Sequence, residues 1–215
     1  MVKESRAGLP RVQPIIPISR KEPFDDPDWL FDFKYDGFRA LLYVEQGSRC
    51  RLVSRNGNTM ARFNALGDQV AAELELDDAI LDGEVIAADE TGRPQFYVLL
   101  RRTRRPAYVA FDILWLNGLD VRSLPLRERR RRLEGIIPKR SSVISDALSV
   151  QGRGRELFEL MRAHDLEGIV AKRLADPYEP RVRWFKIKNP QLHAERGERG
   201  VIQRAEVTLA AQIRF

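Results

Sequence analysis

The sequence predicts an α+β domain with antiparallel β-sheets. Three observations support this prediction. Apolar stretches with strand character outnumber those with helical spacing, and they follow one another in hairpin-like succession. Neither a G-x-G-x-x-G nor a G-x-x-x-x-G-K-[ST] phosphate loop occurs in the chain. A doubly wound parallel sheet is therefore disfavoured.

The first strands are predicted from alternating apolar and polar residues and from turn signals. Residues 1–28 contain five prolines and are expected to form an extended lead-in with little regular structure. Trp29–Lys34 and Phe38–Glu45 are predicted strands, and Asp36-Gly37 between them is a turn signal, so the two are expected to form a hairpin. The further predicted strands are Arg51–Ser54, Ala79–Ala88, Tyr108–Leu116, Gly168–Lys172 and Arg183–Lys188.

Three helices are predicted between these strands. Asn64–Leu76 and Glu156–His164 carry apolar residues at helical spacing, and Leu126–Ile137 is a basic helix. The pattern weakens after Pro190. We therefore expect one domain over residues 1–190 and a C-terminal tail over residues 191–215.

The composition is that of a basic intracellular protein. The 215 residues include 37 Lys+Arg and 31 Asp+Glu, a net charge of +6, which favours a polyanionic partner but equally suits an ordinary basic protein. Cys50 is the only cysteine, which excludes an intrachain disulfide, and together with His164 and His193 it cannot form a Cys/His zinc site. No signal-like or membrane-length apolar stretch occurs, so no membrane association is expected.

Lys34-Tyr35-Asp36-Gly37 is the first candidate for chemistry. A lysine at the end of an apolar strand can point its amine into a cleft, and a neutral amine is a nucleophile. Taken alone, this short pattern is better explained as an ordinary β-hairpin turn. Five further motifs follow in order: Ser54-Arg55-Asn56-Gly57, Leu81-Asp82-Gly83-Glu84-Val85, Phe111-Asp112-Ile113-Leu114, the stretch from Glu167 to Lys172, and Trp184-Phe185-Lys186-Ile187-Lys188.

This ordered series resembles the nucleotidyltransferase motifs of ATP-dependent DNA ligases, in particular the ligase module of bacterial non-homologous end joining. The resemblance extends from about Pro23 to Pro190. It implies an ATP-grasp-like nucleotidyltransferase fold, in which two antiparallel sheets with flanking helices hold the nucleotide in the cleft between them. It also implies ATP as AMP donor, Mg²⁺ or Mn²⁺ as metal, and nicked or broken double-stranded DNA as partner.

The resemblance assigns the reacting groups. Lys34 is expected to take up AMP, and Lys186 and Lys188, which share one strand face, are expected to contact the α-phosphate. Glu84 and Glu167 are expected to contact ribose or the metal. The alternatives are a solvated edge for the two lysines and buried ion pairs for the two carboxylates.

The resemblance also assigns the nucleotide-binding groups. Phe111 is expected to stack on adenine, although core packing would also explain it. Arg39 and Arg55 are expected to contact phosphate and ribose, and Lys172 to face the phosphates. Asp32 stands where these ligases usually carry a glutamate that reads adenine, and it is one methylene shorter.

Two basic clusters and the chain length bear on the wider function. Residues 101–105 and 127–132 could contact DNA phosphates or form solvated faces. The family's second domain, an oligonucleotide-binding (OB) barrel, is expected to be absent, because residues 191–215 are too few to form one. We therefore expect an OB-domain or end-joining protein as a possible partner. The expected location is the bacterial cytoplasm or nucleoid. The alternatives are an RNA ligase, a capping-type nucleotidyltransferase or a non-catalytic DNA-binding relative.

Overall fold

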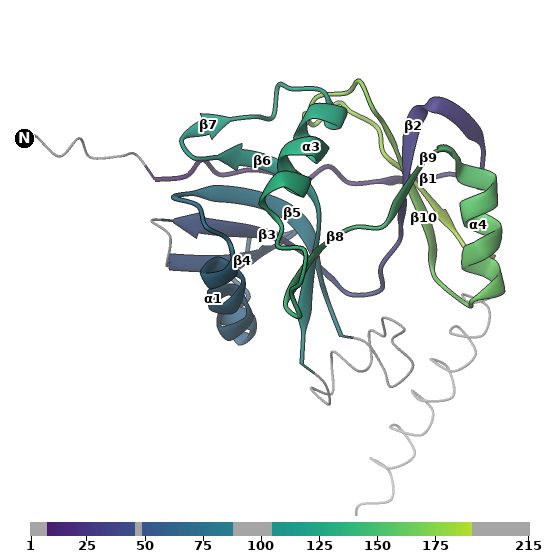
Figure 1. Ribbon diagram of the computed structural model, residues 1–215. Coiled ribbons are helices and arrows are strands. Elements are labelled where there is room, and N and C mark those ends of the chain that lie inside the picture. Colours follow the sequence, from purple (N-terminus) through teal and green to yellow (C-terminus); the bar gives the residue numbers. More distant parts are fainter. Residues whose placement is uncertain (1–7, 46–48, 88–104, 191–215) are drawn as a thin grey trace, which may run out of the picture.

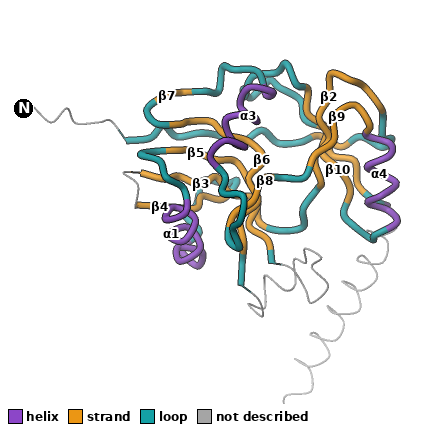
Figure 2. The backbone as a smooth tube through the Cα atoms, in the orientation of Figure 1, coloured by secondary structure: helices purple, strands orange, loops and turns teal. Residues whose placement is uncertain are grey.

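The computed structural model describes residues 8–45, 49–87 and 105–190, which form two β-sheets with helices on their outer faces (Figure 1). Sheet A has the strand order β1-β11-β10-β2-β9, and sheet B has the order β4-β3-β5-β6-β7, with β8 paired to β6. Each sheet thus combines strands from distant parts of the chain, as the tube in Figure 2 also shows.

Sheet A is built from Ile18–Ser19 (β1), Asp25–Phe33 (β2), Ser149–Arg153 (β9), Gly168–Arg173 (β10) and Phe185–Lys188 (β11). Its strands alternate apolar and polar residues. Phe31, Ile169 and Ile187 are buried against the helix Gly154–Ala163 (α4), so the opposite face carries the intervening polar residues. Lys186, Val170 and Asp32 are neighbours in the strand register on that polar face.

Sheet B is built from Phe38–Glu45 (β3), Arg49–Ser54 (β4), Ala79–Ile86 (β5), Ala107–Leu116 (β6), Leu119–Asp120 (β7) and Ile144–Asp146 (β8). One face packs against Asn64–Glu73 (α1), which follows the 3-10 turn Ala61–Phe63 (η1), and against Leu126–Ile136 (α3). The other face, with Leu41, Tyr43 and Ile80, packs against Trp184. The two sheets thereby face each other across a shared apolar contact.

The predicted α+β class with two sheets and flanking helices is confirmed, and the predicted strands and helices all occur, with ends shifted by a few residues. The expected lead-in contains more structure than predicted, because β1 and the start of β2 lie within it. Two strand pairs are parallel, β1 with β11 and β6 with β8. The short strands β7, β8 and β9 were not predicted, because they carry little apolar periodicity.

The predicted hairpin between the first two long strands is wrong. β2 pairs with β10 and β9 in sheet A, whereas β3 pairs with β4 and β5 in sheet B. Lys34-Tyr35-Asp36-Gly37 is therefore the link that carries the chain from one sheet to the other. The link passes close to β5: a Cβ on Gly37 would lie 2.2 Å from the carbonyl oxygen of Val85, so only glycine fits.

None of the described helices is long and apolar enough to cross a membrane.

Candidate active site

A cleft of about 450 Å³ opens between the two sheets, a size that suits a nucleotide. Sheet A, sheet B, the link between them and the N-terminal segment all contribute to its walls. The cleft residues are Ile16, Pro17, Asp32, Phe33, Lys34, Tyr35, Gly37, Phe38, Arg39, Ser54, Arg55, Asn56, Met60, Glu84, Phe111, Val170, Lys172, Trp184, Lys186 and Lys188. Every sequence-predicted site residue except Glu167 is among them, and Glu167 contacts one of them.

Lys34 lies at the point where β2 leaves sheet A. Its backbone N–H donates to the carbonyl of Gly168 at 2.9 Å, which fixes its position against β10. Its Nζ atom is 2.7 Å from Oε1 of Glu167, and the two side chains are 20% and 9% exposed. The amine is thus held at the cleft by a mostly buried ion pair.

Lys186 and Lys188 are presented on the same face of β11. Lys186 is opposite Val170 and Lys188 is opposite Gly168 in the register, and both lysines border the cleft. The crossing at Gly168 is tight: its φ is 133°, and a Cβ there would lie 2.1 Å from the carbonyl of Ile187. Glycine therefore allows β10 and β11 to approach, and Lys34 and Lys188 are brought to neighbouring positions.

Glu84 is a half-buried carboxyl group beside Lys34. It is opposite Arg39 in the register of β3 and β5, and Oε1 accepts the backbone N–H of Gly37 at 3.2 Å. Burial raises the pKa of Glu84 to about 7; the charges of Lys34 and Arg39 oppose this rise and that of Glu167 adds to it. The carboxylate form is therefore costly near neutral pH unless a cation joins it.

Replacement of Glu84 by glutamine is expected to stabilise the fold above neutral pH. Because the folded-state pKa exceeds the ordinary value of 4.5, the cost of ionisation grows as pH rises from about 4.5 and is complete above about 7. Glu84→Gln should unfold at nearly the same temperature as the wild type at pH 4, and be more stable by about 1–3 kcal/mol at pH 8.

Thermal unfolding at both pH values measures this difference. Glu134→Gln on the exposed surface of α3 is the matched control and should change nothing. If Glu84→Gln is less stable than the wild type at pH 8, this result would contradict the raised pKa of Glu84.

Phe111 enters the cleft from a β-bulge. Asp82 pairs with Asp112 and Gly83 with Ala110, so Phe111 is the extra residue of β6. Bulges redirect side chains next to functional sites. The Phe111 carbonyl accepts a hydrogen bond from Nη1 of Arg130 at 3.1 Å. Its ring meets Trp184 edge to face, with centroids 6.0 Å apart.

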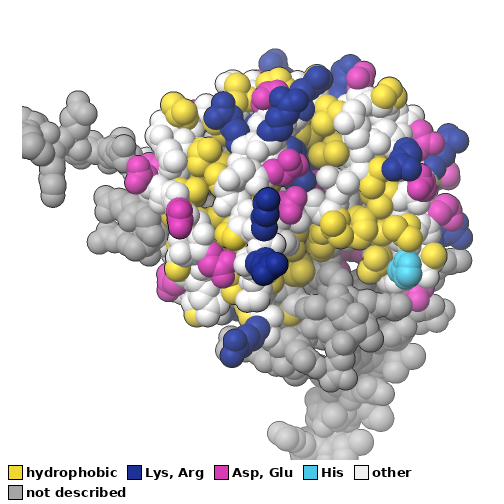
Figure 3. All heavy atoms as spheres, viewed as in Figure 1, with side chains coloured by type: hydrophobic (Ala, Val, Ile, Leu, Met, Phe, Trp, Pro, Cys, Tyr) yellow, Lys and Arg dark blue, Asp and Glu magenta, His cyan; other side chains and the backbone are white. Residues whose placement is uncertain are grey.

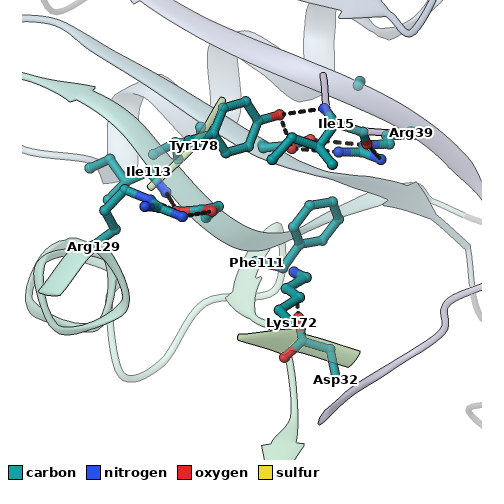
Figure 4. A network of polar contacts seen from close by, with 12 residues as sticks. Ile15, Asp32, Arg39, Phe111, Ile113, Arg129, Lys172 and Tyr178 are labelled. Atoms are coloured by element: carbon teal, nitrogen blue, oxygen red, sulfur yellow. Dashed lines mark hydrogen bonds and ion pairs between the residues drawn. The ribbon is translucent and has the colours of Figure 1, made fainter. Parts of the chain in front are cut away.

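Asp32 and Lys172 form a buried pair beneath the aromatic rings (Figure 4). Lys172 Nζ is 2.5 Å from Oδ2 of Asp32, and 4.0 and 4.2 Å from the ring centres of Phe111 and Trp184. Burial lowers the pKa of Lys172, and Asp32 opposes that change. Apart from this ion pair, neither charged group makes a hydrogen bond to a described residue. Lys172, which is expected to face the phosphates, lines the cleft and contacts the two aromatic rings.

Arg39 and Arg55 differ in how much of each guanidinium is engaged. Arg39 donates to both oxygens of buried Asp82, at 3.1 and 2.7 Å, and to the carbonyl of Ile15 at 2.6 Å. Its charged group therefore borders the cleft while remaining tied to the protein. Arg55 is exposed in the turn after β4 and borders the cleft directly.

The second basic cluster is partly structural. Arg129 forms a bidentate ion pair with Asp112, and Arg130 bonds the carbonyls of Phe111 and Ala147; both arginines are buried. Only Arg127, Arg131 and Arg132 are exposed, and on the face in Figure 3 basic and acidic side chains are mixed. Of the first cluster, residues 101–104 lie outside the described residues, as do His193 and the tail. His164 is exposed at the end of α4.

Trp184 was missed as a site residue. It is 2% exposed, borders the cleft and contacts both Phe111 and Lys172. The signal was present, since the alternation that puts Lys186 and Lys188 on one face puts Trp184 there as well. Arg130 and Asp82 were also missed, and no local pattern indicates their partners.

The described residues contain no group of three or more His, Cys, Asp or Glu side chains suited to a metal. Glu84 and Glu167 remain as two carboxylates near Lys34 that can supply oxygen donors. Mg²⁺ is usually bound by one or two carboxylates together with phosphate oxygens and waters. The pair therefore fits a divalent ion that arrives with a phosphate-bearing ligand.

Two facing sheets, a lysine at their junction and further cations at the same cleft define a nucleotide-binding protein of the nucleotidyltransferase class. The family model for the ATP dependent DNA ligase domain matches residues 18–188, so the chain belongs to the ATP-dependent DNA ligase family.

Its relatives include ligases of bacterial end joining. The chain is 34% identical over 165 residues to the multifunctional non-homologous end joining protein LigD of Mycolicibacterium smegmatis, covering 74% of this chain and 21% of that protein. It is 32% identical over 189 residues to the prophage-derived DNA ligase-like protein LigB of Bacillus subtilis, covering 83% and 67%. The chain thus spans about a fifth of the length of LigD.

A solved mycobacterial DNA ligase D, complexed with ATP and MES, has the same fold. The TM-score is 0.71 at 29% identity, over 82% of this chain and 60% of that one. The ligase of bacteriophage T7 in complex with ATP superposes at a TM-score of 0.57 with 16% identity, which supports the fold alone.

Proposed function

We propose that this chain is the adenylation domain of a DNA ligase, in which Lys34 takes AMP from ATP and passes it to the 5′-phosphate of a DNA nick or break during repair. The observation that carries the proposal is the position of Lys34, which directly follows β2, pairs with Glu167 and lines the same cleft as Lys186 and Lys188. Family membership and the LigD relatives support it.

The first step forms a bond between Nζ of Lys34 and the α-phosphorus of ATP. The bond from that phosphorus to the pyrophosphate oxygen breaks, and the attacking amine gives up a proton. Before the attack, the Lys34 ammonium must also lose a proton to become a neutral amine. Glu167, the carboxylate in contact with it, takes this proton in our proposal. Lys186, Lys188 and Arg55 supply positive charge for the phosphates.

The base lies at the aromatic end of the cleft in this proposal. Phe111 stacks on adenine, Asp32 accepts from its amino group, and Lys172 donates to a ring nitrogen rather than to phosphate. Both charged groups have the free hydrogen-bonding capacity that this requires. Glu84 and Arg39, which are opposite each other in the register of β3 and β5, contact the ribose in this proposal.

Mg²⁺ or Mn²⁺ would be held by Glu84 and Glu167 with oxygens of the triphosphate. When bound, it supplies positive charge that offsets the charge developing on the phosphates. The protein's part is to hold the Glu84 carboxyl group in place through the backbone N–H of Gly37.

Later steps transfer AMP to DNA and seal the break by attack of the 3′-hydroxyl. The partner is nicked or broken double-stranded DNA, with an OB-domain or end-joining protein assisting, and the location is the bacterial cytoplasm or nucleoid. The DNA-repair relatives and the basic balance of the chain support this assignment.

Intact mass after incubation with ATP and Mg²⁺ tests the first step. The wild-type chain is expected to gain one AMP unit, and not to gain GMP from GTP, which distinguishes ligation from capping. Transfer to nicked DNA but not to nicked RNA would then distinguish a DNA ligase from an RNA ligase. No AMP gain, even with an OB domain supplied in trans, would contradict the proposal and favour a non-catalytic DNA-binding relative.

A further inference from the structure

Residues 12–18 form a segment, called the strap below, that lines the cleft through Ile16 and Pro17. The N–H of Val12 donates to the hydroxyl of Tyr43 at 3.1 Å, and that of Ile15 donates to the hydroxyl of Tyr178 at 3.2 Å. The N–H of Ile18 donates to the carbonyl of Trp184 at 2.9 Å. Val12 and Ile15 are also buried in the apolar contact between the sheets.

The strap is further attached to the cleft wall itself. The carbonyl of Ile15 accepts Nη1 of Arg39 at 2.6 Å, and Arg39 is held by Asp82. The Tyr178 hydroxyl donates to the same Asp82 carboxylate at 2.6 Å, so one acidic group organises both fastenings (Figure 4). Ile15 is therefore fixed on its N–H side and on its carbonyl side.

The residues between these fastenings point toward the cleft. Ile16 and Pro17 line it, and Ile16 is 62% exposed, whereas Val12 and Ile15 are 8% and 3% exposed. A rigidly fastened segment that presents one large apolar side chain at a binding cleft favours an apolar contact with the ligand. Neither Ile16 nor Pro17 can bind phosphate through its side chain.

We infer that Ile16 is a nucleotide-contacting residue that covers the nucleoside half of the ligand, and that Tyr178 is the positioning residue that holds it there. The inference rests on the proposed function. Ile18 of the strap bonds the carbonyl of Trp184, just before β11, and the Arg39 guanidinium lies 5.3 Å from the ring centres of both Phe111 and Trp184. The strap therefore borders the aromatic end of the cleft. The strap up to Pro17 precedes the part of the chain that matches the family model, which begins at residue 18.

Ile16→Ser and its control Ile18→Ser test the contact. Ile18 is also an exposed apolar residue, 46% exposed, but it is not among the cleft residues. Ile16→Ser is expected to raise the KM for ATP in self-adenylylation roughly five- to ten-fold, with kcat unchanged, because the apolar area it would cover is lost equally in the bound state and the transition state. Ile18→Ser should behave as the wild type.

Binding of adenosine and of inorganic tripolyphosphate separates the two halves of the ligand. Ile16→Ser should weaken adenosine by the same factor and leave tripolyphosphate unchanged. Equal losses for both ligands, or no difference from Ile18→Ser, would overturn the contact while leaving wild-type adenylylation intact. A wild-type chain that binds neither ATP nor adenosine would overturn this inference together with the proposed function.

Tyr178→Phe tests the positioning role, with Tyr43→Phe as its control, since each change removes one hydroxyl that accepts a strap N–H. Tyr178→Phe should raise the KM for ATP several-fold without lowering kcat, and the rise should disappear when Ile16 is already serine. The Tyr43 hydroxyl binds the N–H of Val12, four residues before Ile16. Tyr43→Phe should therefore leave the KM for ATP unchanged. A Tyr178→Phe variant with a lower melting temperature but an unchanged KM would overturn the positioning role.

Discussion

Lys34→Arg is expected to abolish self-adenylylation, by at least about a thousand-fold, while ATP still binds. The guanidinium retains the positive charge and can pair with Glu167 as the lysine does at 2.7 Å. It stays protonated at any accessible pH, so it has no free electron pair with which to attack phosphorus. Loss of chemistry with binding preserved would separate the nucleophile from the cations that merely hold phosphate. Intact mass and equilibrium ATP binding measure the two effects.

Lys139→Arg is the control for this experiment, because that lysine is exposed just after α3 and far from the cleft residues in sequence. It should accept AMP as the wild type does. Peptide mapping of the wild-type adduct should place AMP on the peptide containing Lys34. An adduct on Lys186 or Lys188, or an adduct that persists in Lys34→Arg, would contradict the assigned nucleophile.

Arg129→Met is expected to destabilise the fold by about 3–5 kcal/mol, which is the largest loss of stability we expect from a single substitution in this protein. Arg129 and Asp112 are 1% and 0% exposed, and their two hydrogen bonds measure 2.8 and 2.9 Å. Removal of the arginine leaves a carboxylate buried without its partner. It also removes the hydrogen bonds to the carbonyls of Leu124 and Asp176, which connect α3 to the loop after β10.

Chemical denaturation measures this loss, and Arg131→Met is the matched control. Arg131 is on the same helix and pairs with Glu128, but its side chain is 71% exposed, so its replacement should change stability by less than about 0.5 kcal/mol. Replacing Arg129 and Asp112 together by apolar residues should recover part of the stability, because no unpaired charge then remains buried. Equal effects of Arg129→Met and Arg131→Met would show that the buried pair contributes nothing.

The local elements, and most of the candidate residues that line the cleft, could be predicted from the sequence. The strands of both sheets alternate apolar and polar residues because one face of each is buried, and that alternation is visible without knowledge of the partner strands. The motif order identifies Lys34, Glu84 and Lys186 as candidates, and the structure brings them to one cleft. The strand predictions depend only on residues a few positions apart, whereas the candidate site residues follow from the order of the motifs along the chain.

The pairing of those elements could not be predicted. Asp36-Gly37 looks the same in sequence whether the chain turns back into one sheet or passes to another, and the outcome depends on β9 and β10, more than 100 residues later. The direction of the Phe111 side chain depends on the β-bulge in β6, where Arg130 of α3 donates a hydrogen bond to the Phe111 carbonyl. Such contacts join residues whose separation in sequence carries no periodic signal.

The sequence by itself determined which groups are available to this protein: a lysine ending an apolar strand, carboxylates within apolar strands, and lysines alternating on a third. Only the tertiary structure decided how they are engaged. Lys172 is paired with Asp32 beneath aromatic rings, Arg39 is tied to Asp82, and the strap over residues 12–18 is fastened by Tyr178. The physical reason is that a buried charge must find a partner in space, and the nearest partner in space is rarely the nearest in sequence.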